Sequence, residues 1–158
     1  PEAQLDRFLM KLSVGYPSFE DEQEILRRRR QRRQDHFDLQ QVTSPEELLA
    51  MRAAMEDVHV EADLENYIAA IVHHTRRDQR TAVGASPRGS LALLKLARAQ
   101  ATLEGRSYVV PDDVKTFIQP ALSHRMVLKP DLWMNKMAAF EVLDSIANLV
   151  PVPVIEGV

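Results

Sequence analysis

The sequence predicts a mainly α-helical fold, in which a helical bundle follows a short helix and a single strand. Apolar residues recur at intervals of three and four over several long segments, the pattern of helices that bury one face. Residues suited to begin a helix stand directly before such segments, as in Ser44-Pro45-Glu46-Glu47 and Ser86-Pro87. Among the longer apolar runs, only Leu9–Val14 has the length and composition of a buried strand.

The first elements are a short helix or turn over residues 1–8 and the strand Leu9–Val14, which ends at Gly15-Tyr16-Pro17. No other long strand is expected, and a strand without a partner leaves its backbone hydrogen bonds unmade. We therefore expect its sheet to belong to a part of the protein outside this sequence. Without that sheet, Leu9–Val14 would either fray or pair with a second copy of the chain.

Two helices are expected between residues 20 and 58. The first begins at Glu20 among acidic residues and ends in the arginines of Arg27–Arg33, a distribution that complements the helix dipole. A polar loop follows over residues 34–42. Ser44 and Glu47 then form a capping-box pattern, and the apolar residues after it have helical spacing: Leu48, Met51, Met55 and Val58.

Four more helices complete the predicted bundle. One opens at Glu61 or Asp63 and carries an apolar face that includes Leu64, Tyr67, Ile68, Ile71, Val72 and Thr75. The next, from Pro87 to Glu104, is apolar around most of its circumference, so we expect it at the centre, with Gly105 as its C-terminal cap. After a candidate short strand at Tyr108–Val110, a helix begins at Pro111, and the last helix spans about Leu132 to Leu149.

Composition excludes several classes of protein. The chain has 158 residues, 45% of them hydrophobic, which is enough for one core and a fragment of another domain. A net charge of −3 argues against a general nucleic-acid coat, and the lack of cysteine excludes a disulfide framework and agrees with a cytoplasmic protein. No apolar run reaches the roughly 18 residues of a membrane span. Because Pro1 stands where methionine would begin a protein, we expect a piece of a longer one.

The loop Gly84–Ser90 is the strongest candidate site. Ser86 can cap the helix that follows, and Pro87 suits the first helical position. Arg88 then lies beside the unsatisfied amide groups of the first turn, which attract anions, and its guanidinium adds a forked, permanently charged donor. This arrangement predicts a phosphate contact at Arg88, although a solvated first-turn arginine is the alternative.

Other suggestive patterns have simpler explanations. The arginines of Arg27–Arg33 cover most of a helix circumference, lack interleaved aromatic residues and follow acidic ones, so a solvated helix end or an inter-subunit contact is favoured over nucleic-acid binding. His73 and His74 point about 100° apart on a helix and cannot readily share a metal ion. Trp133, Met134, Met137 and Phe140 are most simply packing residues. No nucleophile–base pair or carboxylate dyad is evident.

Several motifs together resemble the MoxR family of AAA+ ATPases in their order and approximate spacing, over nearly the whole chain up to about Pro153. They are Glu2-Ala3-Gln4-Leu5-Asp6-Arg7-Phe8, Gly15-Tyr16-Pro17, Gly84-Ala85-Ser86-Pro87-Arg88-Gly89, Tyr108-Val109-Val110-Pro111-Asp112-Asp113-Val114 and His124-Arg125. One departure is Val110, where a hydroxyl N-cap would be expected, so the aspartates that follow would have to serve that helix end.

The resemblance implies the C-terminal part of a AAA+ module. Residues 1–17 would be the end of its α/β core, residues 18–153 its helical lid, and residues 154–158 a tail, with a hinge between Gly15 and Glu20. In this family the arginine that matches Arg7 is the arginine finger, which reaches a neighbouring subunit's nucleotide. From the residues alone, an ion pair of Arg7 with Asp6, Glu2 or another local acid is favoured. The arginine that matches Arg88 is sensor 2, and Ser86 and Pro87 belong to the same nucleotide-contacting loop.

The resemblance also implies a cofactor and partners. The parent protein would use ATP and Mg²⁺, assemble into a ring, with a hexamer expected, and act as a chaperone on partner proteins, often together with von Willebrand factor A domain proteins. Neither nucleic acid nor a membrane is expected as a partner. The client protein cannot be identified from the residues.

The chain lacks the residues that hold the phosphates and Mg²⁺. It has no G-x-x-x-x-G-K-[ST] loop and no strand that ends in paired acidic residues, so we expect this polypeptide alone neither to bind ATP tightly nor to hydrolyse it. The alternative function is a non-catalytic helical protein-interaction module that uses Arg27–Arg33 or the last helix. A small helical DNA-binding domain is a third, less favoured, interpretation.

Overall fold

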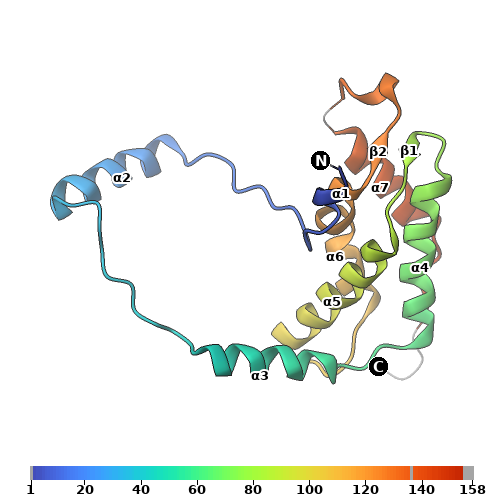
Figure 1. The fold of residues 1–158 in the computed structure, drawn as a ribbon, viewed down its shortest axis with the longest axis horizontal. Coiled ribbons are helices and arrows are strands. Elements are labelled where there is room, and N and C mark those ends of the chain that lie inside the picture. The colour runs from blue at the N-terminus through green and yellow to red at the C-terminus, as the bar shows by residue number, and fades with distance from the viewer. Residues whose placement is uncertain (1, 136, 155–158) are drawn as a thin grey trace. The chain divides into compact units, whose positions relative to one another are not determined.

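The computed structural model describes residues 2–135 and 137–154, and these are mainly helical, as predicted (Figure 1). They divide into two compact units. One contains the described residues up to Lys11 and those from Arg52 onward, and the other is Leu12–Met51. Each unit is described separately below.

The first unit is a bundle of four helices, α4 (Ala62–Arg77), α5 (Pro87–Leu103), α6 (Pro111–Leu122) and α7 (Ala138–Leu149). Helix α5 packs against α4 and α6, and α7 packs against α4 and α6. The fully buried side chains come from all four helices, and the largest include Leu64, Ile71, Leu93, Leu122 and Leu143. The central position predicted for α5 is confirmed, although Leu91 on its outer face is exposed.

The ends of these helices agree with the local signals in the sequence. Gly105 has a φ of 71°, a left-handed conformation that favours glycine, directly after the end of α5. At the start of α6, where Val110 has no hydroxyl, the Asp113 carboxylate accepts a hydrogen bond of 2.8 Å from the Val110 amide. The expectation that an aspartate serves this helix end is therefore confirmed.

A small antiparallel sheet lies beside the bundle and was not predicted. Strand β1 (Thr81–Val83) pairs with β2 (Val127–Leu128), with Thr81 opposite Leu128 and Val83 opposite Val127. These strands are too short to show a period of two in the sequence. The short strand considered at Tyr108–Val110 is reduced to a single parallel bridge between His59 and Tyr108.

The strand predicted at Leu9–Val14 does not form. Helix α1 (Glu2–Leu5) is the expected short helix, but the backbone after it makes no strand pairing. Met10 is partly buried against the core and the Lys11 amide donates to the carbonyl of Pro120, at 2.9 Å, whereas Val14 is exposed. An apolar run becomes a strand only where a neighbouring edge accepts its hydrogen bonds, and the described part of the chain offers no such edge here.

The last predicted helix begins later than expected. Pro130–Leu132 form a short 3-10 helix, η2, and α7 starts only at Ala138. The Asn135 side chain accepts a hydrogen bond from the Met137 amide, a local turn that competes with helix before α7 begins. Position 136, and the predicted tail apart from Val154, lie outside the described residues.

The second unit, Leu12–Met51, contains α2 (Phe19–Arg32) and most of α3 (Pro45–Glu56), joined by irregular backbone. None of its residues, all of which the structure describes, is buried. Both helices have the reciprocal hydrogen bonds of a capping box at their N-termini. Ser18 pairs with Asp21 in α2, which was not predicted, and Ser44 pairs with Glu47 in α3, as predicted.

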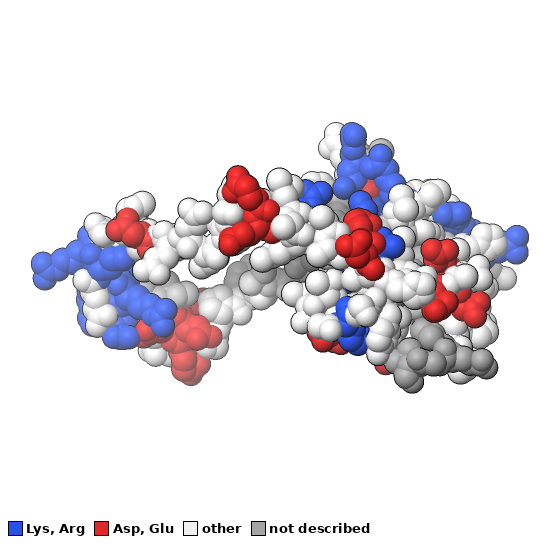
Figure 2. Space-filling model, turned by 90° about the horizontal axis from the view of Figure 1, so that it is seen from below, with Lys and Arg blue, Asp and Glu red and all other residues white. Residues whose placement is uncertain are grey.

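The arginines at the end of α2 contact nearby side chains of the same unit. Figure 2 shows Lys and Arg gathered at this end of α2, with acidic side chains beside them. Arg27 and Arg28 both bind Glu24, Arg29 binds Asp35, and Arg32 lies 4.9 Å from the centre of the Phe37 ring. These contacts fit the interpretation of a solvated helix end.

Candidate functional site

The N-terminus of α5 has the structure that its sequence predicts. Ser86 is the N-cap, with φ −73° and ψ 171°, and its hydroxyl accepts the Arg88 amide at 3.2 Å. Pro87 occupies the first helical position, where its missing N–H costs nothing. Arg88 projects from the first turn with 57% of its side chain exposed.

The loop before α5 is held against the end of α4. The Ala85 amide donates to the buried hydroxyl of Thr75, at 2.9 Å, and Arg76 donates to the Ala85 carbonyl, at 2.7 Å. A Cβ on Gly84 would lie 2.6 Å from backbone atoms of Arg76, so only glycine fits so close to that helix. These contacts place Ser86 and Arg88 on rigid backbone.

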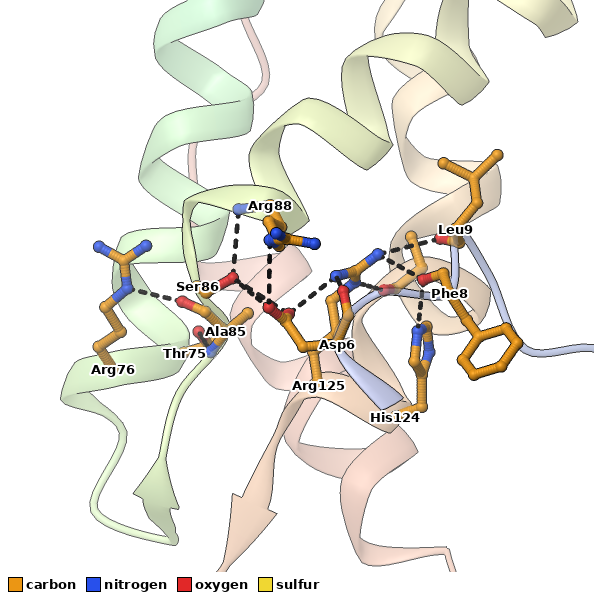
Figure 3. Close-up of polar contacts among 11 residues, drawn as sticks. Asp6, Phe8, Leu9, Thr75, Arg76, Ala85, Ser86, Arg88, His124 and Arg125 are labelled. Carbon is orange, nitrogen blue, oxygen red and sulfur yellow. Dashed lines mark hydrogen bonds and ion pairs between the residues drawn. The ribbon is translucent and has the colours of Figure 1, made fainter. Parts of the chain in front are cut away.

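A carboxylate from the start of the chain already lies at this helix N-terminus. Both Asp6 carboxylate oxygens accept from the Ser86 hydroxyl, at 2.9 and 3.0 Å, and one accepts from Arg125 at 2.8 Å (Figure 3). The Arg88 Nε lies 3.9 Å from the same carboxylate. We call these four residues, Asp6, Ser86, Arg88 and Arg125, the Asp6 cluster. Negative charge at this position is favoured by the exposed amide groups of the first turn.

The Asp6 cluster brings the segment that carries Arg7 close to the helix that carries Arg88. Arg7 is exposed in the turn after α1, where its amide donates to the Gln4 carbonyl at 3.1 Å. Asp6 and Phe8, on either side of it, are both bonded to Arg125. Arg7 and Arg88, which are far apart in the sequence, are thus linked through the hydrogen bonds and ion pairs of the Asp6 cluster.

Sequence reasoning missed the roles of Asp6 and Arg125. Asp6 was considered as a possible ion-pair partner of Arg7 and as part of a family motif, and Arg125 only as part of a family motif. Arg125 follows the apolar helix α6 and is buried in η1 (Ser123–Arg125), with 2% of its side chain exposed. A buried arginine needs an acidic partner, but its partner is 119 residues away in the sequence, and no local pattern identifies it.

The other residues considered as sites do not converge on a ligand-binding arrangement. The His73 and His74 rings lie edge to face with centroids 6.4 Å apart. Within residues 2–135 and 137–154, no group of three or more His, Asp or Glu side chains is arranged to hold a metal ion. None of the helices described there is both long enough and apolar enough to cross a membrane.

Several known proteins are similar to this chain in sequence. Residues 73–146 match the model of the AAA lid domain. YeaC of Bacillus subtilis, an uncharacterized protein, is 38% identical over 98% of this chain and 48% of its own length. Chaperone MoxR1 of Mycobacterium tuberculosis is 35% identical over 100% of the chain and 44% of its own length.

The fold also resembles that of a solved structure. A crystal structure of a candidate ATPase from Cytophaga hutchinsonii superposes with a TM-score of 0.86 at 29% identity, and the match covers 98% of this chain and 49% of that one. The chain therefore spans about half the length of the relatives that it matches. The match to the lid model begins on α4 and includes Ser86, Arg88 and Arg125 of the Asp6 cluster.

Proposed function

Because this chain belongs to the MoxR family of AAA+ ATPases, we propose that its bundle is the lid that closes over ATP and couples hydrolysis to chaperone-like remodelling or assembly of partner proteins. In this proposal Arg88 contacts the nucleotide of its own subunit, and Arg7 reaches the nucleotide of the next subunit in a ring, with a hexamer expected. Von Willebrand factor A domain proteins are the proposed partners.

The observation that carries the proposal is the Asp6 cluster. It connects the turn that presents Arg7 to the first turn of α5, which presents Arg88. Phosphoryl transfer develops charge on the equatorial phosphate oxygens, and guanidinium groups stabilise that charge through forked hydrogen bonds. A rigid link between two such arginines suits an enzyme in which the lid position and the neighbour's active site must change together.

The residues of this chain suit one contact with an ATP phosphate but do not supply ligands for Mg²⁺. Arg88 stands at a helix N-terminus with an exposed guanidinium, so its surroundings suit a phosphate oxygen. The chain has no G-x-x-x-x-G-K-[ST] phosphate-binding loop and no strand that ends in paired acidic residues for Mg²⁺. The proposed chemistry therefore needs an α/β core that supplies both, and we expect no hydrolysis by this polypeptide alone.

The test is ATP hydrolysis and binding by a protein that carries this chain together with such a core. Arg7→Ala should lower kcat by roughly 10³-fold, the scale of arginine-finger losses, with little change in ATP affinity. Arg88→Ala should lower hydrolysis, affinity or both. Arg77→Ala, which removes another exposed arginine, is the matched control and should leave both unchanged.

Two results would count against the proposal. Wild-type turnover in both the Arg7 and Arg88 variants would refute the assigned roles. Magnesium-dependent single-turnover hydrolysis by the isolated chain would refute the need for a separate core.

A further inference from the structure

Arg125 uses its guanidinium to hold the backbone on both sides of Arg7. Its Nε donates to the Ala121 carbonyl at 2.7 Å, which fixes the side chain against the end of α6. One terminal nitrogen binds the carbonyl and the carboxylate of Asp6, and the other binds the carbonyls of Phe8 and Leu9, at 2.6 and 3.3 Å. Every N–H direction of the guanidinium therefore has an acceptor.

The segment that Arg125 holds has little other support. Helix α1 has four residues, and the turn after it is closed by two backbone hydrogen bonds of 3.1 Å, made by the amides of Arg7 and Phe8. Leu5, Phe8 and Leu9 are all exposed, so apolar burial contributes little. His124, whose Nε2 lies 3.1 Å from the Phe8 carbonyl, assists Arg125 at this point, and the Ser86 hydroxyl binds the Asp6 carboxylate. Arg125 still makes most of the side-chain hydrogen bonds to the backbone on either side of Arg7.

Arg125 also controls which arginine Asp6 pairs with. Its terminal nitrogen lies 2.8 Å from the Asp6 carboxylate, whereas the Arg88 Nε lies 3.9 Å away. Figure 3 shows the contacts that both guanidinium groups make with the Asp6 carboxylate. If Arg125 were removed, Arg88 would be the nearest remaining cation, and a closer pair would neutralise the charge that a phosphate would meet.

We propose that Arg125 is a positioning residue that holds Arg7 for the neighbouring subunit's nucleotide and keeps Asp6 from neutralising Arg88. This inference rests on the proposed function of those two arginines. It makes one buried side chain responsible for both nucleotide contacts. The bundle and the arginine finger of one subunit then move as a single body.

The first test substitutes Arg125 in the ATPase that carries this chain together with a phosphate-binding core. Arg125→Lys keeps a cation beside Asp6 but cannot bind the separate carbonyls, so kcat should fall roughly 10- to 100-fold, as expected for a misplaced catalytic group, while ATP affinity is retained. Arg125→Met should show the same fall in kcat and also weaken binding of a fluorescent ATP analogue. Adding Asp6→Asn to Arg125→Met should restore that affinity, because the carboxylate that neutralises Arg88 is gone.

A double-mutant comparison separates positioning from folding. In an Arg7→Ala background, Arg125→Lys should cause no further loss of kcat, because its effect passes through Arg7. Arg106→Lys is the matched control. Like Arg125, Arg106 donates hydrogen bonds to a carboxylate, that of Asp113, and to a backbone carbonyl, that of Tyr108, but neither group belongs to the segment that carries Arg7. This variant should lower the melting temperature without lowering kcat.

The outcomes distinguish the two proposals. If Arg7→Ala leaves turnover unchanged, the proposed function fails and this inference fails with it. If Arg7→Ala lowers kcat but Arg125→Lys does not, only the inference is wrong. Additive losses from Arg7→Ala and Arg125→Lys would likewise overturn the positioning role.

Discussion

The segment Leu12–Met51 and the bundle of α4 to α7 stabilise their helices by different means. Helix α2 buries no residue, whereas α5 buries six, including Leu93 and Ala97, which are fully inaccessible to solvent. In α2 the stabilising contacts are polar and local. In the bundle they are apolar and join residues distant in the sequence.

Local electrostatics account for α2. Its first turn is acidic and its last turn is basic, which complements the helix dipole. Glu24 binds both Arg27 and Arg28, and these hydrogen bonds lower the pKa of Glu24 from 4.5 to about 2. The stability of such a helix depends on pH and on salt concentration, and it does not depend on packing in the apolar core of the bundle.

The bundle also contains ion pairs, and some of them are partly or fully buried. Asp113, with 3% of its side chain exposed, receives two hydrogen bonds from Arg106, and this pairing raises the pKa of Arg106. Such a pair must stay complete, because removing one partner leaves a buried charge. Similar charge pairs therefore contribute differently to the free energy of unfolding in the two units.

The largest expected effect is in the apolar core. Leu93→Ala should lower the free energy of unfolding of the bundle by about 3–5 kcal/mol, because it opens a cavity at a fully buried position. Urea denaturation followed by circular dichroism measures it. Leu91→Ala, on the exposed face of the same helix, should cost less than about 1 kcal/mol. Equal losses at the two positions would contradict the burial difference.

The next effect separates the buried ion pair from an exposed one. Arg106→Met should cost about 3 kcal/mol, because Asp113 would be left buried without its partner. The control is Lys115→Met, which breaks the exposed pair with Asp112 and should cost below about 1 kcal/mol. If Arg106→Met were as mild as the control, the buried pair would have no special role.

A smaller effect concerns the pH dependence of the bundle. The side-chain hydrogen bond from Arg80 lowers the pKa of Asp78 below its ordinary 3.8. Since the folded pKa is lower than the unfolded one, the stabilisation is complete above the unfolded value and is lost as the pH falls through the folded value. Below about pH 4 the unfolding free energy should therefore fall less steeply in Asp78→Asn than in wild type, by about 1 kcal/mol at most. Identical slopes would exclude a contribution from Asp78.

The smallest effect on the bundle comes from a change in α2. Ser18→Ala removes the N-cap hydroxyl that accepts the Asp21 amide and should destabilise the start of α2 by about 1 kcal/mol. Hydrogen exchange at the Asp21 amide should accelerate, while the unfolding free energy of the bundle stays unchanged. Ser13→Ala, in the extended segment before α2, is the control. A change in bundle stability would show that the two units are not energetically independent.

The features that the sequence predicted correctly depend on a few adjacent residues. Ser86 and Pro87 begin α5, Ser44 and Glu47 begin α3, and Gly105 ends α5, each through hydrogen bonds or dihedral angles set within about one helical turn. The helix N-terminus at which the candidate site was predicted forms for the same reason. The contact of Arg88 with a phosphate, and the role of Arg7, stay predictions.

Most of the features that were wrong or missed depend on distant partners. Leu9–Val14 has the composition of a strand, but strand formation needs a neighbouring edge, and the backbone instead contacts Pro120. The β1–β2 pairing joins residues more than forty positions apart along the chain. The predicted start of the last helix was too early, because a turn at Asn135 competes locally with helix.

By itself, then, the sequence determined the helical class, the helix caps and the family resemblance, because these depend on local hydrogen bonding, periodicity and short motifs. Only the tertiary structure decided that Asp6, Ser86, Arg88 and Arg125 form one cluster. The physical reason is that a buried guanidinium must find acceptors wherever the folded chain brings them. For Arg125 these acceptors lie on the segment that carries Arg7.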